Sequence, residues 1–231
     1  MMKLGIIGAM ELEVETLLGI MVNKTARSVA GSDFYEGSIS GTNCVVVRCG
    51  IGTVNAALCV QILVSTFGVT HIVNTGIAGS LCARLDIGDF VISQDAMYHD
   101  FDCCVFGYPA GKVPGMPEQF TADVALRQLA FAAAEEVNPG RNSIGRIASG
   151  DQFICSQDQK DKIIAITGAL CTEMEGAGIA HAAYRNNIPF VIIRAISDKA
   201  DNSADMDYPT FEKLAAHRCA EVTRRLAAKL A

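Results

Sequence analysis

The stretch that decides the fold is LCTEMEGAGIAHAAYRNNIPFVIIRAISDKAD, residues 170–201. It begins with a short apolar run that ends in Glu173-Met174-Glu175, and a run of small residues typical of a packed helix follows. The apolar run 189–193 comes next and ends in Arg194-Ala195-Ile196-Ser197-Asp198. We interpret this pattern as strand, helix, strand, with polar side chains at the C-terminal ends of both strands. That edge is where open α/β sheets bind ligands.

The whole chain has the composition of a globular α/β protein. Half of its 231 residues are apolar, and we expect residues 1–231 to form a single domain without linkers or repeats. No apolar run approaches the roughly 18 residues that a membrane-spanning helix needs. The net charge of −6 includes no basic block, which argues against nucleic acid or a membrane surface as the main partner.

The nine cysteines indicate neither a disulfide framework nor a metal site. Several lie within apolar runs, Cys103 and Cys104 are adjacent, and none belongs to a CxxC pair. The four histidines are dispersed and lack the spacing of metal ligands. We therefore expect reduced thiols in a cytoplasmic protein that uses neither a metal nor an organic cofactor.

Apolar runs and periodic segments predict the remaining elements. The first apolar run, 3–8, leads into an acidic helix rather than a cleavage sequence, so we expect a buried strand and no signal peptide. Further strands are predicted at residues 34–39, 44–49, 71–74, 88–93 and 143–149. Further helices are predicted at about 54–67, 122–137, 157–166 and 209–230, the last with Pro209 in its first turn. Residues 94–116 have no regular pattern, and a loop this long is usually functional or forms an interface.

Glycines follow several of the predicted strands, within residues 5–8, 50–52 and 76–79 and at Gly150. None of these segments matches GxGxxG or GxxxxGK[ST], so dinucleotide and nucleoside-triphosphate binding are not indicated. Each glycine taken singly is explained by a tight turn. Four such segments gathered at one sheet edge would instead let the backbone approach a flat or sugar-like ligand.

Acidic residues at strand ends are the candidates for chemistry. Glu173 and Glu175 lie two apart, so on an extended segment they point the same way, with Met174 opposite. Asp198 follows a buried strand, where it either caps a helix or stands as a buried acid. A buried acid beside other carboxylates has a raised pKa, which a general acid needs.

The first predicted helix carries three more carboxylates, Glu11, Glu13 and Glu15. Acidic side chains in a first helical turn are favoured by the helix dipole regardless of function. The pattern by itself does not choose among the three.

Five blocks of sequence, in order along nearly the whole chain, resemble the 5′-methylthioadenosine/S-adenosylhomocysteine nucleosidases. They are GIIGAMELEVE (5–15), NTGIAGS (74–80), SGDQFI (149–154), EMEGAGIAH (173–181) and RAISDKAD (194–201). The resemblance implies a nucleoside-phosphorylase-like α/β fold with three αβα layers around a central mixed, twisted sheet. It also implies a homodimer that hydrolyses the bond between adenine and ribose in a small adenine nucleoside.

The matched blocks imply roles for single residues. Cleavage through a ribosyl-cation-like transition state needs a base that activates water, an acid that protonates the adenine, and groups that order the ribose hydroxyls. By the resemblance, Glu13 is the base and Asp198, with Ser197 beside it, is the acid at the purine N7. Glu175 binds the ribose hydroxyls.

The rest of the implied pocket surrounds these groups. Met174 packs against the sugar, and Arg194 helps to hold the water and Glu175. The other implied substrate contacts are Gly79, Phe153, Ile154, Glu173 and Tyr208. The pocket for the 5′-substituent is implied at Met10 and Ile51, together with Cys103, Phe106 and Pro114 of the partner subunit. Ordinary core packing would explain the apolar members, were it not for their place within matched blocks.

One departure and two rival functions bear on this interpretation. Ile77 stands where many members carry a small hydroxyl residue, so one polar contact near the ribose is lost. A phosphorylase of the same fold would need cationic groups for phosphate, whereas the first loop offers only acids. A non-catalytic nucleoside-binding module would keep the adenine contacts but would not need the acid and the base together.

The preferred substrate is left open by the sequence. An apolar 5′ pocket accepts a thioether but discriminates weakly between a methyl group and a larger tail. Similar enzymes also cleave 5′-deoxyadenosine or aminodeoxyfutalosine.

Overall fold

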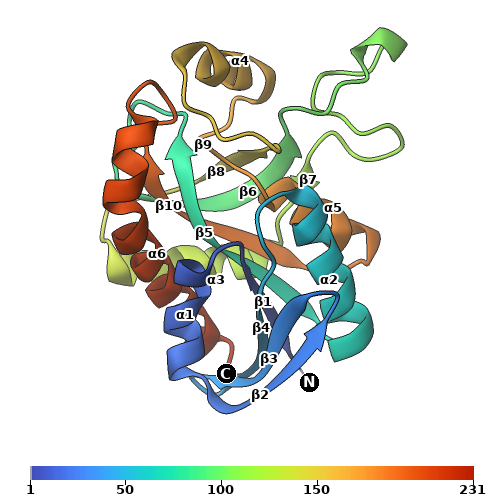
Figure 1. Ribbon diagram of the computed structural model, residues 1–231, viewed down its shortest axis with the longest axis vertical. Helices are drawn as coiled ribbons and strands as arrows, with labels where there is room; N and C mark the ends of the chain where they lie inside the picture. The colour runs from blue at the N-terminus through green and yellow to red at the C-terminus, as the bar shows by residue number, and fades with distance from the viewer. Residues whose placement is uncertain (1) are drawn as a thin grey trace.

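A twisted sheet of ten strands forms the middle of the computed structural model, which describes residues 2–231 apart from the side chains of Asp205 and Met206 (Figure 1). The strands are β1 (Leu4–Gly8), β2 (Val22–Val29), β3 (Ser32–Ile39), β4 (Thr42–Arg48), β5 (His71–Ser80), β6 (Phe90–Tyr98), β7 (Phe120–Thr121), β8 (Asn142–Ser149), β9 (Cys171–Glu173) and β10 (Phe190–Asp198). Their order is β10-β6-β8-β9-β5-β1-β4-β3-β2, with β7 paired to β6. Because β10 also pairs with β5, five of these strands form a closed ring.

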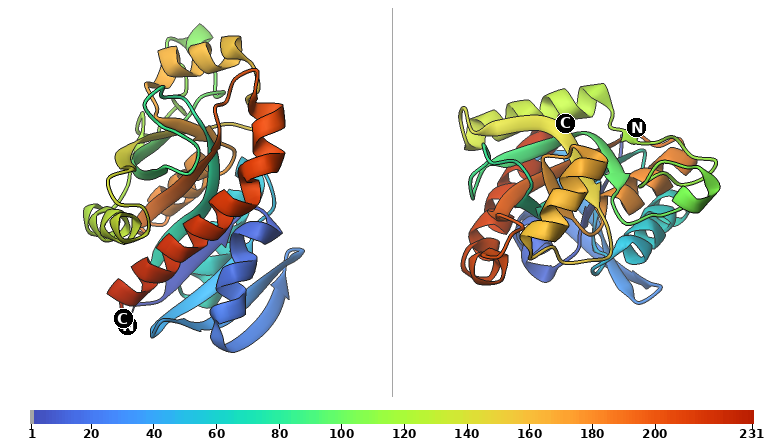
Figure 2. Two further views of the ribbon diagram at one scale, coloured as in Figure 1. Left: turned by 90° about the vertical axis from the view of Figure 1, so that its left-hand side faces the viewer. Right: turned by 90° about the horizontal axis from the view of Figure 1, so that it is seen from above.

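Helices cover both faces of the sheet and give the molecule its three layers (Figure 2). The helices are α1 (Glu11–Ile20), α2 (Thr53–Phe67), α3 (Val124–Val137), α4 (Gln157–Thr167), α5 (Gly176–Arg185) and α6 (Ala204–Lys229). Buried residues of α2 and α5 belong to one hydrophobic cluster, and those of α1, α3 and α6 belong to another. Since both faces of the central strands are buried, these strands are apolar without alternation.

The long strand β5 fixes where the site is built. It pairs in parallel with β1 through its first half and with β10 along most of its length. Its last residues, Gly79 and Ser80, pair with β9, and Gly79 also stands opposite Asp198. The C-terminal ends of β5 and β10 therefore meet at the short strand β9, which carries Glu173.

Several predicted elements differ from the observed ones for identifiable reasons. Strand β2 was not expected, because it is an edge strand whose residues are almost all exposed and show no alternation. Strand β5 runs to Ser80 rather than residue 74, so the glycines at 76 and 79 lie within a strand and not in a turn. The glycines at 5 and 8 likewise lie within β1.

The prediction that Pro209 opens the last helix is wrong. Helix α6 begins at Ala204, and Pro209 lies inside it, where it cannot donate a backbone hydrogen bond. Asp201 closes the preceding turn by accepting hydrogen bonds from the amide and the hydroxyl of Ser203. Helix α6 therefore begins after this turn and before Pro209.

The predicted long loop is shorter than expected because β6 extends to Tyr98. Residues 99–119 contain only the short 3₁₀ helix η1 (Cys104–Phe106) and project from the body beside α5 (Figures 1 and 2). Across residues 2–231, no helix combines the length and the apolar composition needed to cross a membrane.

Candidate active site

A cavity of about 490 Å³ opens at the edge where β5, β9 and β10 end. Most of the residues predicted for the site line it: Met10, Glu13, Ile51, Gly79, Phe153, Ile154, Glu173, Met174, Glu175, Asp198 and Tyr208. The lining also includes Ala9, Ile77, Gln152, Thr172 and Pro209. None of these lining residues is Lys, Arg or His. The cavity therefore presents carboxylates and apolar surface, and no cation, to a ligand.

Glu13 is the carboxylate of α1 that the fold brings into the cavity. Its Oε2 accepts hydrogen bonds from the amides of Ala9 (2.6 Å) and Met10 (3.0 Å), and its Oε1 accepts one from the amide of Ile77 (3.1 Å). Burial raises the pKa of Glu13, and this effect is opposed by the positive charge of Arg194 and by the three amides. Among the three acids of this helix, Glu11 and Glu15 are exposed and only Glu13 is buried.

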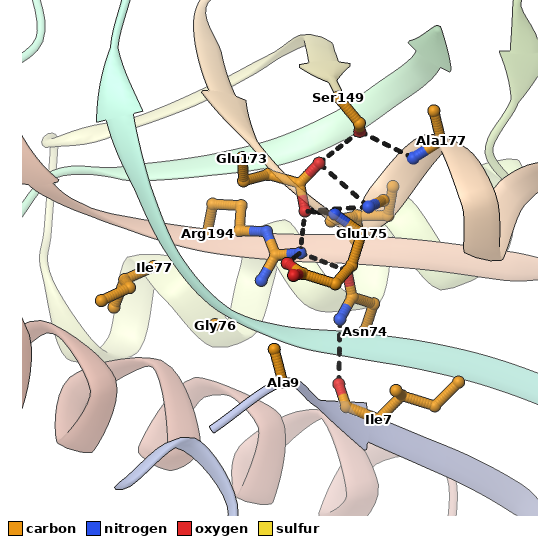
Figure 3. Close-up of polar contacts among 12 residues, drawn as sticks. Ile7, Ala9, Asn74, Gly76, Ile77, Ser149, Glu173, Glu175, Ala177 and Arg194 are labelled. Atoms are coloured by element: carbon orange, nitrogen blue, oxygen red, sulfur yellow. Dashed lines mark hydrogen bonds and ion pairs between the residues drawn. The ribbon is translucent and has the colours of Figure 1, made fainter. Parts of the chain in front are cut away.

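A buried arginine contacts two further carboxylates, those of Glu173 and Glu175 (Figure 3). The guanidinium of Arg194 on β10 donates from Nη2 to Asn74 Oδ1 at 2.5 Å and to Glu173 Oε2, and the same nitrogen lies 3.8 Å from Glu175 Oε2. Arg194 is fully buried and lies behind the two glutamates, so it is not part of the cavity wall. Such a cation is stable in the interior only because these acceptors surround it.

Glu173 uses its oxygens within the protein. Besides Arg194, it accepts hydrogen bonds from the amides of Glu175 and Gly176 and from the hydroxyl of Ser149. The Ser149 hydroxyl accepts in turn from the amide of Ala177. Glu173 thus connects the end of β8 to the first turn of α5 (Figure 3).

Glu175 has fewer partners than Glu173. Its Oε1 accepts one hydrogen bond, from the amide of Gly52 at 3.0 Å. Burial, followed by the negative charge of Glu173, raises the pKa of Glu175 to about 8. The alternation expected for an extended segment does not cover all three residues, because β9 ends at Glu173, and Met174 lines the cavity together with Glu173 and Glu175.

Asp198 is the last residue of β10, at a shift of register against β5. Its Oδ1 accepts from the amide of Ala200 and its Oδ2 from the hydroxyl of Ser197, both at 2.8 Å. It does not cap a helix, because α6 begins only at Ala204. Burial is the main cause that raises the pKa of Asp198. Ser197 is buried behind the cavity wall and orients this carboxyl group.

Two glycines of β5 make room for the charged groups. A Cβ at Gly76 would lie 2.5 Å from Glu13 Oε1 and would overlap the guanidinium of Arg194. A Cβ at Gly79 would lie 2.7 Å from Asp198 Oδ1. Any side chain at either position would displace a carboxylate of the site.

Two aromatic rings flank the cavity. Phe153 follows β8 and is 46% exposed, and its ring meets that of Tyr208 on α6 edge to face, with centroids 5.5 Å apart. The Tyr208 hydroxyl contacts Met10 Sδ at 3.2 Å. An exposed ring at the wall of an otherwise apolar cavity suits a flat, partly polar ligand.

Three predicted residues lie elsewhere. Cys103, Phe106 and Pro114 belong to the projecting segment 99–119 and do not line the cavity of their own chain. Phe106 is 76% exposed, and its neighbour Val105 is also highly exposed. The expected contribution from a partner subunit stays a prediction.

Some contributors were missed from the sequence. Asn74 and Ser149 are buried polar residues in or at the end of strands that lead to the cavity, so the strand-end rule that selected Glu173 could have selected them. Thr172 carries a buried hydroxyl in the cavity wall that has no hydrogen-bond partner among the described residues. The Ile77 amide holds Glu13, and a backbone group carries no signal in the side-chain pattern.

No group of His, Cys, Asp or Glu side chains in the part of the chain that the structure describes is arranged to hold a metal ion. The cavity wall itself carries the carboxylates of Glu13, Glu173, Glu175 and Asp198. Glu13, Glu175 and Asp198 can exchange protons with a ligand or accept its hydroxyl groups.

Comparisons with known proteins identify the family of this chain. Residues 3–228 match the family model described as phosphorylase superfamily. A 5′-methylthioadenosine/S-adenosylhomocysteine nucleosidase of Anoxybacillus flavithermus is 38% identical over 99% of both chains. The crystal structure of such a nucleosidase from Neisseria meningitidis in complex with methylthio-immucillin-A superposes with a TM-score of 0.96 at 36% identity, covering 99% of this chain and 100% of that one.

A futalosine hydrolase of Helicobacter pylori is also similar, with a TM-score of 0.94 and 30% identity over 99% of this chain and 98% of that one. The three-layer α/β fold with a mixed sheet, expected from the sequence, is confirmed by these matches.

The raised pKa of Glu175 predicts a pH dependence of stability. The unfolded chain loses this proton near the ordinary value of 4.5, whereas the native protein keeps it until about pH 8. The native state therefore binds more protons in this window, and the free energy of unfolding falls as the pH rises, by at most about 1.4 kcal/mol per pH unit for one group. Urea denaturation from about pH 5 to about pH 8 will measure this slope in the wild type and in Glu175→Gln.

Glu175→Gln is expected to have the shallower slope, because it removes one of the groups that titrate. Glu13 and Asp198 keep their contributions of the same sign in both proteins. The exposed residue Glu15 supplies the control, since Glu15→Gln should leave the slope unchanged. Equal slopes for Glu175→Gln and the wild type would contradict the raised pKa.

Proposed function

The chain belongs to the phosphorylase superfamily and, within it, to the 5′-methylthioadenosine/S-adenosylhomocysteine nucleosidases, and we propose that it hydrolyses the N-glycosidic bond of these two nucleosides. The products are adenine and the 5′-substituted ribose. The observation that carries the choice of hydrolysis is the absence of Lys, Arg and His from the described lining of the cavity, which presents four carboxylates instead. A phosphate nucleophile needs cationic groups, which this lining does not offer, whereas a carboxylate such as Glu13 accepts a proton from water.

Glu13 is proposed as the base. Its raised pKa makes the carboxylate a better proton acceptor than an exposed glutamate, and its three amide donors fix its direction. It takes a proton from water while the water oxygen bonds to the anomeric carbon of the ribose. Its neighbour Arg194 is a positioning residue, because its partners inside the protein are Glu173 and Asn74.

Asp198 is proposed as the acid. Burial raises its pKa and so favours the protonated form that a donor requires. It gives its proton to N7 of the adenine as the bond between the anomeric carbon and N9 breaks, and the base leaves neutral. Ser197, which donates to Asp198 Oδ2, fixes the orientation of the carboxyl group.

The remaining lining residues are assigned to substrate binding. Glu175, which has one amide partner and lies in the cavity wall, accepts hydrogen bonds from the ribose hydroxyls, with Met174 and Gly79 against the sugar. Phe153 and Ile154 hold the adenine, with Tyr208 beside them, and Met10 and Ile51 hold the 5′-substituent. Glu173 belongs to this set through its position beside Glu175.

A homodimer is part of the proposal. The projecting segment 99–119 exposes Val105 and Phe106, and Ile51 at the cavity is itself 55% exposed. Exposed apolar patches of this kind mark interaction surfaces. Cys103, Phe106 and Pro114 of one subunit would then cover the 5′ end of the other subunit's cavity.

We propose a cytoplasmic location because the cysteines are free thiols. All nine lie within the described residues as free thiols, five of them buried, which is usual where the environment is reducing.

Product analysis tests the reaction. We expect the protein to release adenine and free 5-methylthioribose from 5′-methylthioadenosine at a rate that inorganic phosphate does not change. Chromatography of the products with and without phosphate measures this. A phosphate-dependent sugar 1-phosphate would overturn hydrolysis, and tight adenine binding without cleavage would favour a binding module. 5′-Deoxyadenosine and aminodeoxyfutalosine, tested alongside, will define the range of substrates.

Amide substitutions test the two proposed proton-transfer groups. Glu13→Gln and Asp198→Asn are each expected to lower kcat about 10²- to 10⁴-fold, since an amide neither accepts the water proton nor donates one to adenine. Steady-state kinetics with 5′-methylthioadenosine measures the loss. Glu15→Gln, on the exposed face of the same helix, is the matched control and should keep the wild-type rate. A normal rate in either active-site variant would remove that residue's role.

The dimer has its own test. Sedimentation should give a species of about 49 kDa, twice the 24.5 kDa of one chain. Phe106→Ala is expected to lower kcat/KM for 5′-methylthioadenosine about tenfold, because an apolar contact at the 5′ end is lost. Val124, an exposed apolar residue on α3, serves as the control through Val124→Ala. A fully active monomer would contradict the shared pocket.

A further inference from the structure

A second cavity adjoins the candidate active site. It has a volume of about 540 Å³ and shares Ala9, Met10 and Ile51 with the first cavity. Its remaining wall is formed by the first residue of α1, the turn before β3 and the first half of β3, and the end of β4 with the two residues after it: Glu11, Gly31, Ser32, Asp33, Tyr35, Arg48, Cys49 and Gly50. The two cavities therefore have in common Met10 and Ile51, to which the proposed function assigns the 5′-substituent.

The chemistry of the second cavity differs from that of the first. It contains a cation, Arg48, and two carboxylates, Glu11 and Asp33. Arg48 Nη1 lies 3.4 Å from Glu11 Oε2, and both side chains are about 60% exposed, at 59% and 62%. An exposed ion pair of this kind contributes at most about 1 kcal/mol, so exchanging it for contacts with a ligand costs little.

Charges of both signs at the 5′ end of a nucleoside pocket suit one class of 5′-substituent. The tail of S-adenosylhomocysteine continues past the sulfur through two methylene groups to a carbon that bears an ammonium and a carboxylate. We infer that the second cavity binds this amino-acid tail, with Arg48 on the carboxylate and with Glu11 and Asp33 on the ammonium. The inference rests on the proposed function, because it places the sulfur beside Met10 and Ile51.

The geometry of the charged groups supports this assignment. The Arg48 guanidinium can bind a carboxylate through two parallel hydrogen bonds, which is the strongest pairing available to an exposed arginine. Asp33 is held by a hydrogen bond from the Ser28 hydroxyl across the β2–β3 hairpin, so its position is fixed by the fold. The methyl group of 5′-methylthioadenosine ends at the shared apolar wall and does not reach these charges. Arg48 would therefore contribute to the binding of S-adenosylhomocysteine and not to that of 5′-methylthioadenosine.

Kinetics with three nucleosides tests the tail site. For Arg48→Ala, kcat/KM for S-adenosylhomocysteine is expected to fall about ten- to a hundredfold, mainly through KM, since a charge-assisted hydrogen bond is lost. The value for 5′-methylthioadenosine should stay close to that of the wild type. An analogue whose tail ends in an amine and lacks the carboxylate should be cleaved equally by both proteins. Arg48→Lys should restore part of the activity on S-adenosylhomocysteine.

Controls separate this inference from the proposed function. Lys213→Ala removes a positive charge from an exposed position on α6 that lines neither cavity, and it should leave all three values unchanged. Equal losses on all substrates in Arg48→Ala, or no loss on any, would overturn the tail site while leaving nucleoside hydrolysis in place. Failure of the wild-type protein to cleave any of the three would overturn the proposed function itself.

Discussion

The buried guanidinium of Arg194 is the constraint on which the site depends. A cation in the interior is strongly destabilising unless acceptors surround it, and here they come from β5 as Asn74 and from β9 as Glu173. The middle of β5 and the end of β9 must therefore both lie beside Arg194. Glycine is required at position 76 of β5, because any side chain there would overlap the guanidinium of Arg194.

The same arginine explains why the carboxylates differ. One cation faces three buried glutamates, and Glu173 makes the closest contacts with it. Burial then dominates at Glu13 and Glu175 and raises the pKa of each, because the arginine and the amides only partly offset the cost of a buried charge. At Asp198 burial is again the main cause of the raised pKa, helped by the negative charges of Asp207 and Asp201 and opposed by the hydrogen bonds from Ala200 and Ser197. The fold thereby holds proton-exchanging groups without a metal ion in the proposed mechanism.

The two adjoining cavities divide the proposed recognition of an adenine nucleoside by chemical type. The first cavity offers a flat aromatic wall and carboxylates, which suit a purine and a sugar. The second offers charges of both signs, which suit an amino-acid tail. Met10 and Ile51 separate them with apolar surface, which suits a thioether. Such a division would let one protein accept both a short and a long 5′-substituent.

The sequence by itself determined the central strands, because both of their faces are buried and their apolar runs are continuous, as at residues 189–193. It also placed Glu173, Glu175 and Asp198 at strand ends, and matched blocks selected Glu13 from three adjacent acids. The sequence did not predict the edge strand β2 or the first residue of α6, because neither element has an apolar pattern at its boundary. Only the tertiary structure decided that Asn74 holds Arg194, that backbone amides hold Glu13, and that Arg48 borders the site. These depend on contacts between residues far apart in the chain, which no local pattern encodes.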